Sequence, residues 1–237
     1  MAKIHMLLQG KGGVGKSLIA SVLAQYKLAK GQKPLCIDTD PVNATFFGFK
    51  ALKVKRLELM DGEEINPRNF DALVELVAPS KNDVVIDNGA SSFVQLAHYL
   101  VTNEVPQLLQ NMGHELMIHS VITGGQAFED TLHNLRQIVP QFPSEALFVV
   151  WLNPYWGPIE DRGKPFEQLA EYAAMKNRLS ALVTLPTLKM ETYGRDLTEM
   201  LQGRQTFDEA LAKESLTIMT RQRLKIIRDQ LYAQLYN

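Results

Sequence analysis

Residues 10–17 have the types and spacing of a phosphate-binding loop. The segment reads Gly-Lys-Gly-Gly-Val-Gly-Lys-Ser and matches the pattern G-x-x-x-x-G-K-[ST] in full. Glycines let backbone N–H groups surround a phosphate, and the N-terminus of a following helix favours an anion. In this pattern Lys16 reaches the β- and γ-phosphates and the Ser17 hydroxyl ligates Mg²⁺. We therefore expect a nucleotide site formed by Gly12, Gly13, Val14, Gly15, Lys16, Ser17 and Leu18.

The segments that flank the loop are those that its chemistry requires. Residues 4–8 form a short apolar run, which predicts a strand. After the loop, apolar residues recur at helical spacing up to Tyr26, and Gly31 supplies a stop. A glycine-rich turn without a ligand is the alternative, but a strand, a glycine loop and a helix in this order favour phosphate binding.

Aspartates at the ends of two predicted strands could complete the site. Asp87 closes the predicted strand of residues 83–87, whose middle is apolar, and Asp38 and Asp40 lie where the predicted strand of residues 34–38 ends. Ligands of open parallel sheets bind at this carboxyl edge. Phosphoryl transfer needs Mg²⁺ to be held and a water to be aligned, and carboxylates can do both. The alternative is that Asp38 and Asp40 only cap a strand end.

The elements that must position these residues form a repeating pattern. Strand and helix patterns alternate, which predicts an α/β fold with a doubly wound, mostly parallel sheet and helices on both faces. The predicted strands are 4–8, 34–38, 83–87, 116–122, 146–152 and 181–185, and helices are expected at 93–100, 128–139, 193–202, 206–212 and 217–236. We find no linker or repeat, so residues 1–237 are expected to form a single domain.

The least regular stretch is residues 46–69, which carries four basic residues followed by Asp61, Glu63 and Glu64. It could be a mobile loop, a partner-binding insertion or a plain surface excursion, and the last is the simplest interpretation.

Composition excludes several classes of protein. The chain is 46% hydrophobic and 22% charged with a net charge of −1, so no global attraction to nucleic acid or anionic lipid is built in. Its single cysteine, Cys36, excludes an intramolecular disulfide and suggests a reducing compartment. No apolar run approaches membrane-spanning length, and the start leads directly into a predicted strand. We therefore expect a cytoplasmic protein.

A second lysine in the loop indicates which class of phosphate-binding loop this is. Lys11 directly follows the first glycine, and with Asp-Thr-Asp-Pro at 38–41 and Val-Val-Ile-Asp at 84–87 the loop resembles the deviant Walker A ATPases of the ParA/MinD family. The resemblance implies that ATP and Mg²⁺ are bound and that Lys11 reaches the nucleotide of a partner subunit in an ATP-dependent homodimer. It also implies that Asp87 holds the magnesium shell with support from Asp38, and that Asp40 positions the attacking water.

Adenine recognition is predicted from the same resemblance. Asn153 matches the asparagine that reads the base in the family, and Pro186 matches the proline region beside the adenine ring. Asn-Pro is also a common turn initiator, so a structural role for Asn153 stays open. The chain departs from the family where Pro154 replaces a frequent arginine and where residues 88–91 replace the usual Ala-Pro-Pro.

The resemblance implies a slow, partner-stimulated ATPase that acts as a timer. Within the family the chain is most similar to the TraL/StbB-type proteins of conjugative plasmids, which implies a role in plasmid transfer, stability or positioning with a protein partner. A nucleotide-dependent assembly or adaptor protein with negligible turnover is the first alternative. A P-loop kinase or synthetase acting on a small molecule is the second, and the double-lysine loop argues against it.

The last predicted helix suggests two cargo models. Nonspecific DNA could contact a basic face, although such a face is commonly only solvated; it consists of Arg221, Arg223, Lys225 and Arg228. Membrane docking could use an apolar stripe, which is better explained by packing on the sheet; it consists of Leu224, Ile227, Leu231 and Leu235.

Overall fold

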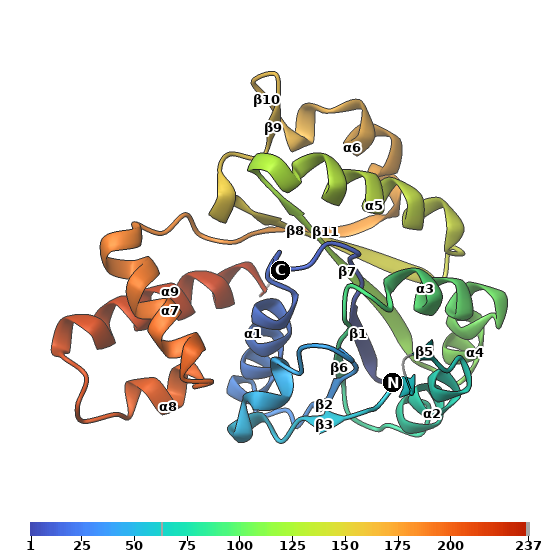
Figure 1. The fold of residues 1–237 in the computed structure, drawn as a ribbon, viewed down its shortest axis with the longest axis horizontal. Helices are drawn as coiled ribbons and strands as arrows, with labels where there is room; N and C mark the ends of the chain where they lie inside the picture. The colour runs from blue at the N-terminus through green and yellow to red at the C-terminus, as the bar shows by residue number, and fades with distance from the viewer. Residues whose placement is uncertain (63, 236–237) are drawn as a thin grey trace.

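A computed structural model describes residues 1–62 and 64–235 of the chain (Figure 1). Within these residues a central sheet has the strand order β11-β8-β7-β1-β6-β2-β3, and each pair of neighbours is parallel. The strands are β1 (Lys3–Leu7), β2 (Leu35–Asp38), β3 (Lys55–Arg56), β6 (Val84–Asp87), β7 (Glu115–Thr123), β8 (Ala146–Asn153) and β11 (Leu179–Thr184). The chain builds one half of the sheet on each side of β1, so the loop after β1 lies at the topological switch point, where ligands of such sheets bind.

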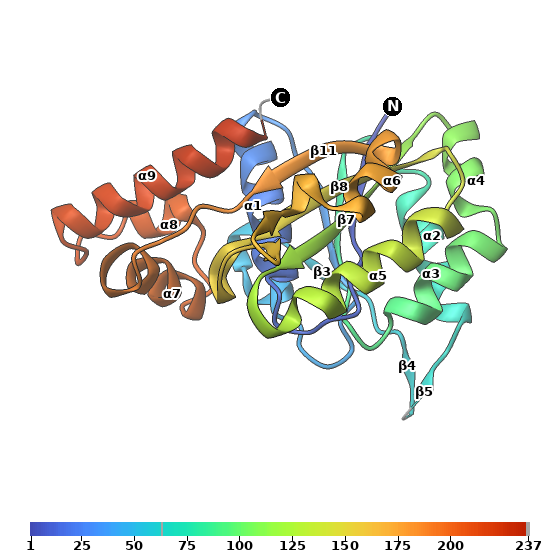
Figure 2. The same ribbon diagram turned by 90° about the horizontal axis from the view of Figure 1, so that it is seen from above.

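Helices cover both faces of the sheet (Figures 1 and 2). Apolar side chains of one face pack with α1 (Lys16–Ala29), α7 (Arg195–Gln202), α8 (Phe207–Leu211) and α9 (Ile218–Gln234). The other face packs with α2 (Arg68–Val77), α3 (Phe93–Thr102), α4 (Val105–Asn111), α5 (Phe128–Gln141) and α6 (Ala170–Met175). The predicted α/β fold class is therefore confirmed.

Side-chain alternation along the first strand explains the two apolar layers. Ile4, Met6 and Leu8 join one buried cluster, whereas Leu7 joins the other. A strand buried on both sides needs mostly apolar residues facing both ways, which is why residues 4–8 are apolar except for the buried His5.

The predicted strands and helices are all present, with ends shifted by a few residues. The first helix ends at Ala29, and Gly31 adopts φ +75° just beyond it. The last helix begins at Ile218 after the Thr217 N-cap and ends at Gln234; its predicted end, Tyr236, lies outside the described residues. The sequence pattern did not predict α2, α4 or α6, of which α4 and α6 are only seven and six residues long.

Residues 46–69 are not a plain surface excursion. Buried apolar side chains anchor this segment in the core, namely Phe46, Phe49, Leu52, Val54 and Leu59. The segment also supplies β3 at the edge of the sheet and the hairpin of β4 (Met60–Asp61) and β5 (Glu64–Ile65). Glu63 lies outside the described residues. Phe46, Phe49 and Leu52 recur every third residue along two short 3₁₀ helices, Phe46–Gly48 and Lys50–Leu52, a pattern too short to predict burial from the sequence.

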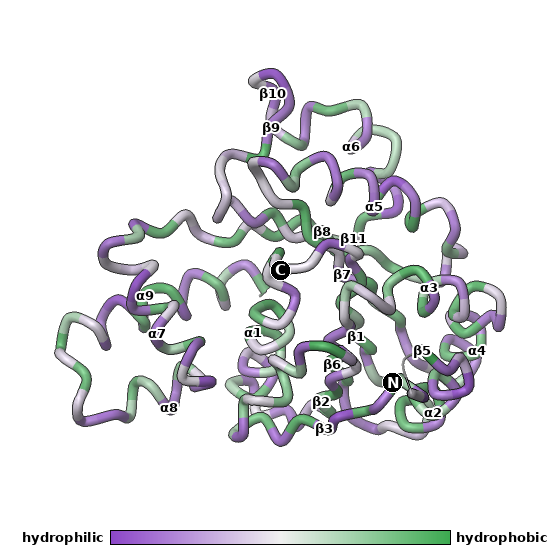
Figure 3. The backbone as a smooth tube through the Cα atoms, viewed as in Figure 1, coloured by the Kyte–Doolittle hydropathy of each residue, from purple (hydrophilic) through white to green (hydrophobic). Residues whose placement is uncertain are grey.

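The apolar stripe of the last helix is part of the core. Leu224, Ile227 and Leu231 are buried, and Leu235 packs against the same cluster. The hairpin of β9 (Glu160–Asp161) and β10 (Lys164–Pro165) is by contrast hydrophilic (Figure 3). Among the described residues, no helix is both long enough and apolar enough to cross a bilayer.

Candidate nucleotide-binding site

The glycine loop joins β1 to α1 and encloses an open concavity of about 530 Å³. Gly15 is the N-cap of α1 with φ 102°, a conformation that a residue with a Cβ atom rarely adopts. The N–H groups of the first helical turn have no intrahelical partners and can therefore bind an anion. The concavity is lined by Gly12, Gly13, Gly15, Lys16, Ser17, Leu18, Asp40, Val42, Asn43, Thr45, Ala90 and Ser91.

Lys16 lies between the loop and the acidic strand ends. Its Nζ atom donates a hydrogen bond to the carbonyl oxygen of Lys11, 3.0 Å away, and its side chain is buried. Burial lowers the pKa of Lys16, and the nearby carboxylates of Asp87 and Asp40 partly oppose that shift. The sheet therefore brings together the lysine and two of the aspartates that the sequence predicts.

The carboxylate of Asp87 is buried and lacks a hydrogen-bond partner among the described residues. It is 1% exposed, and neither of its oxygens has a hydrogen-bond partner among the described residues. Burial raises the pKa of Asp87 to about 7, although the neighbouring Ser17 hydroxyl and Lys16 lower it. An unpaired carboxylate beside a hydroxyl is a donor set of the hard oxygen type that Mg²⁺ prefers, so these two residues fit such an ion.

Asp38 and Asp40 organise the loop that follows β2. Asp38 is fully buried, and its two oxygens accept the backbone N–H groups of Asp40 (3.0 Å) and Phe47 (2.8 Å). Burial raises the pKa of Asp38 and these hydrogen bonds lower it in part. Oδ1 of Asp40 accepts the N–H groups of Val42 and Asn43, at 2.9 and 3.0 Å. Both aspartates thus hold a turn, and their roles at magnesium and water stay predictions.

A buried polar network links the ends of β2 and β6, and the sequence analysis missed it. The hydroxyls of Thr39 and Ser92 both donate to Oδ1 of Asn88, at 3.1 and 2.8 Å. Asn88 is the residue directly after Asp87 and replaces the alanine usual in the resembling family. The network therefore ties the two acidic strand ends together through polar side chains instead of prolines.

Asn153 connects the glycine loop to the end of β8. Its Nδ2 atom donates to the carbonyl oxygen of Val14 (2.9 Å), and its Oδ1 atom accepts the N–H of Tyr155 (3.1 Å). Both ends of the amide are therefore engaged within the protein, as the turn-forming alternative predicts. Reading of a base by Asn153 stays a prediction.

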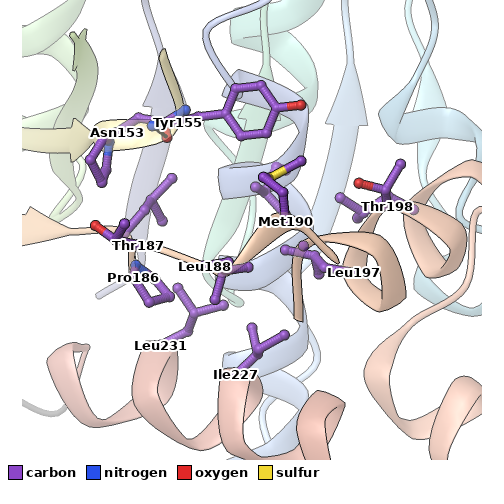
Figure 4. Close-up of a pocket in the computed structure, with 15 residues that line it drawn as sticks. Asn153, Tyr155, Pro186, Thr187, Leu188, Met190, Leu197, Thr198, Ile227 and Leu231 are labelled. Atoms are coloured by element: carbon purple, nitrogen blue, oxygen red, sulfur yellow. Dashed lines mark hydrogen bonds between the residues drawn. The ribbon is translucent and has the colours of Figure 1, made fainter. Parts of the chain in front are cut away.

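An apolar cavity of about 170 Å³ adjoins the loop (Figure 4). Leu18 lines both this cavity and the glycine-loop concavity. Asn153 and Pro186, the two residues predicted beside adenine, both line it as well. The other walls come from Tyr155, from the π-helical turn Met190–Gly194 and from helices α7 and α9. We call it the apolar cavity below.

Lys11 lies at the outer rim of the loop. Its Nζ atom is 2.7 Å from Oδ2 of Asp130, in the first turn of α5, and both side chains are exposed. Lys11 therefore has a partner within its own subunit, which no sequence signal indicated.

The basic face of α9 is partly neutralised. Arg223 pairs with Asp196 at 2.5 Å, and Arg228 pairs with Asp229 at 2.9 Å and with Asp208 at 3.5 Å. These ion pairs weaken the case for a phosphate-binding surface there, because a paired guanidinium must first release its own carboxylate.

An open parallel sheet whose first strand runs through a glycine loop into a helix defines an α/β nucleotide-binding protein. The model of the CobQ/CobB/MinD/ParA nucleotide binding domain matches residues 5–214, and the chain belongs to this family. The resemblance to ParA/MinD ATPases is thereby confirmed at the level of the family.

Curated relatives match the whole chain. It is 69% identical over all 237 residues to Protein TraL of Escherichia coli, covering 98% of that protein. A second Escherichia coli protein of the same name is 70% identical over 99% of this chain and 98% of its own length.

Solved structures share the fold. MinD cell division protein of Aquifex aeolicus superposes with a TM-score of 0.53 at 15% identity, covering all of this chain and 98% of that one. A plasmid partition protein of Borrelia burgdorferi gives 0.50 at 16% identity over 86% of this chain and 96% of its own. At such identities the likeness concerns the fold alone.

Proposed function

We propose that the chain is a Mg²⁺-dependent ATP-binding and slowly hydrolysing dimerisation switch. The observation that supports this most directly is the open glycine-loop concavity beside Asp87, whose buried oxygens have no partner among the described residues. Family membership supplies the nucleotide-binding class, and the two-lysine loop supplies the expectation of a switch.

The residues around the concavity divide the work of phosphoryl transfer. Backbone N–H groups of residues 12–18 and the Lys16 ammonium bind and orient the phosphates. Ser17 and Asp87 would hold Mg²⁺, with Asp38 supporting that shell, and the ion would neutralise charge on the β- and γ-phosphates. Asp40 lines the concavity and is proposed to orient the attacking water. Binding of the ion would also relieve the unpaired state of Asp87.

Pairing of two subunits is the proposed output of ATP binding. Lys11 stands at the rim of the loop, where its ammonium can leave Asp130 and reach the nucleotide of a second subunit. Hydrolysis then removes the γ-phosphate and releases the pair. The turns held by Asp38 and Asp40 would carry that difference to a partner surface.

The proposed setting is plasmid conjugal transfer, stability or positioning in the cytoplasm, with the chain acting as one ATPase domain. It rests on the resemblance to TraL/StbB-type proteins and on full-length similarity to proteins named TraL. A protein of the same transfer or partition system is the proposed partner. Nonspecific DNA would have to contact Arg221 and Lys225, because Arg223 and Arg228 are engaged in ion pairs.

Calorimetry with ATP, ADP and Mg²⁺ tests the proposal. We expect Lys16→Ala to abolish nucleotide binding. As a control, Lys81→Ala changes an exposed lysine that does not line the concavity, and nucleotide binding should stay intact. Absence of heat from any nucleotide with the native chain, or unchanged affinity in Lys16→Ala, would overturn the phosphate site. Tight binding without phosphate release, with or without partner, would favour the assembly or adaptor function.

A further inference from the structure

The apolar cavity has one aromatic wall that the sequence analysis did not single out. Tyr155 lies in the 3₁₀ turn Pro154–Trp156, directly after β8, and is 56% exposed although it lines the cavity. Its ring extends along one side, toward Met190, while Ile227 and Leu231 of α9 lie on the opposite side (Figure 4). A flat aromatic face is therefore available at the mouth of an apolar slot.

Two contacts hold Tyr155 in place. Its backbone N–H donates to Oδ1 of Asn153, 3.1 Å away, and so caps the turn. Its ring packs edge to face against Trp156, with ring centroids 4.8 Å apart and an interplanar angle of 90°. A ring fixed in this way loses little conformational freedom when a ligand stacks on it.

The same asparagine fixes the distance between this ring and the phosphate loop. Nδ2 of Asn153 donates to the carbonyl oxygen of Val14, inside the loop. A Cβ atom on Gly15 would lie 3.1 Å from that Nδ2 atom, so the helix N-terminus also approaches Asn153 closely. One side chain thus couples the aromatic wall to the anion-binding amides.

Only a ligand with both a charged tail and a flat apolar group fits both compartments. The concavity with Lys16 suits phosphates, and the adjoining cavity is lined by Leu18, Pro186, Leu188 and Met190. Leu18 belongs to both linings, so the compartments are contiguous. A nucleoside triphosphate has this division, with a base whose π-face can stack on an aromatic ring.

We propose that Tyr155 stacks on the base of the bound nucleotide and that Asn153 is a positioning residue that aligns this ring with the phosphate loop. This inference rests on the proposed function, since it concerns the same nucleotide. It assigns recognition of the base to an aromatic side chain, in a turn where the resembling family often has arginine.

Calorimetry with two ligands separates the base from the phosphates. The probes are ATP with Mg²⁺ and inorganic tripolyphosphate with Mg²⁺, which lacks the base. We expect Tyr155→Ala to bind ATP about tenfold or more weakly while its affinity for tripolyphosphate is unchanged. Tyr155→Phe, which keeps the ring, is expected to bind ATP like the native chain.

Fluorescence of the native chain supplies a measurement that needs no cavity variant. Trp156 touches the Tyr155 ring and also lines a cavity with residues 11–14 of the loop. We therefore expect ATP to change its emission more than tripolyphosphate does, and Trp156→Phe to abolish both changes. Equal ATP affinity in Tyr155→Ala, or identical responses of Trp156 to both ligands, would overturn the stacking contact. Failure of the native chain to bind either ligand would instead overturn the proposed function itself.

Discussion

The Nζ atom of Lys11 lies 2.7 Å from Oδ2 of Asp130 within one subunit, across 119 positions of sequence. The hydrogen bond from Lys11 lowers the pKa of Asp130, so the carboxylate is charged at neutral pH. Both side chains are exposed, and ion pairs of this kind exchange easily with water and other partners. If Lys11 crosses to a second subunit, Asp130 competes with the partner's nucleotide for the same ammonium group.

We therefore expect Asp130→Asn to pair at lower ATP concentrations than the native chain, because the competing charge is gone. Lys11→Ala is expected to bind nucleotide as a single subunit but to fail in ATP-driven pairing. Light scattering with Mg²⁺ and ATP or ADP measures both effects.

Two exposed charged residues serve as controls. Glu129→Gln removes the neighbouring exposed acid of the same helical turn, and Lys3→Ala removes an exposed lysine that pairs with Glu115. Neither change is expected to alter pairing. A normal ATP-dependent dimer formed by Lys11→Ala would contradict the contact between subunits.

The absence of a side chain at Gly89 allows the Asp40 carboxylate to lie close to the backbone after β6. A Cβ atom on Gly89 would stand 2.8 Å from Oδ1 of Asp40 and 3.0 Å from Cδ of Pro41. That oxygen holds the turn at Val42 and Asn43, so it cannot move without loss of their hydrogen bonds. We expect Gly89→Ala to keep ATP affinity within a few fold and to lower phosphate release roughly ten- to a hundredfold.

Phosphate release under saturating ATP is the measurement for Gly89→Ala. Gly203→Ala is the control, since a Cβ atom there meets its nearest neighbours at 3.4 Å, an ordinary contact distance. Full turnover in Gly89→Ala would mean that the two acidic strand ends do not need this close approach.

Two substitutions of Asp40 separate the effect of its charge from the effect of its hydrogen bonds to the following turn. Asp40→Ala removes both, whereas Asp40→Asn keeps an oxygen that can accept the N–H groups of Val42 and Asn43. We expect both variants to retain ATP and to release phosphate on the order of a hundredfold more slowly, because positioning of water by the carboxylate is lost. If Asp40→Asn released phosphate at the native rate, Asp40 would only hold the turn and would not position the attacking water.

Much of the fold could be predicted because its central strands are short, mostly apolar and buried. The runs ending at Leu8 and Asp87 are examples, and each lies at the centre of the sheet. The short helices α4 and α6 could not be predicted, because six or seven residues show no reliable period. Phe46 and Phe49 are buried through contacts with distant parts of the chain, which a local pattern does not contain.

The candidate site was predictable where its chemistry depends on contiguous residues. The glycine loop is one segment, and Asp87 is the last residue of an apolar strand, so both can be predicted from local sequence. Tyr155 and Asp130 could not, because their roles depend on tertiary neighbours. Tyr155 lines a cavity that helices α7 and α9 complete, and Asp130 meets a lysine of another element.

A buried pair of histidines on the neighbouring strands β1 and β7 predicts how the free energy of unfolding depends on pH. Trp151 donates through Nε1 to Nδ1 of His119, and Nε2 of His119 lies 2.9 Å from Nδ1 of His5. Burial lowers the pKa of His119 to about 3 and that of His5 well below its usual value, and the second histidine adds to the effect on His5. His119 is therefore neutral in the folded chain at pH 5, whereas free histidine has a pKa near 6.5, and the pKa of His5 is shifted in the same direction.

The sign of the effect follows from proton binding. Between pH 6.5 and about 3 the unfolded chain binds protons that the folded chain excludes, so the free energy of unfolding falls as the pH falls. His119 contributes up to about 1.4 kcal/mol per pH unit in that range. We expect urea unfolding of His119→Gln to show a weaker loss of stability from pH 6.5 to 4.5 than the native chain. As a control, His98→Gln changes an exposed histidine and should show the same dependence of unfolding free energy on pH as the native chain. If His119→Gln lost stability as steeply as the native chain, His119 would not stay neutral in the folded state.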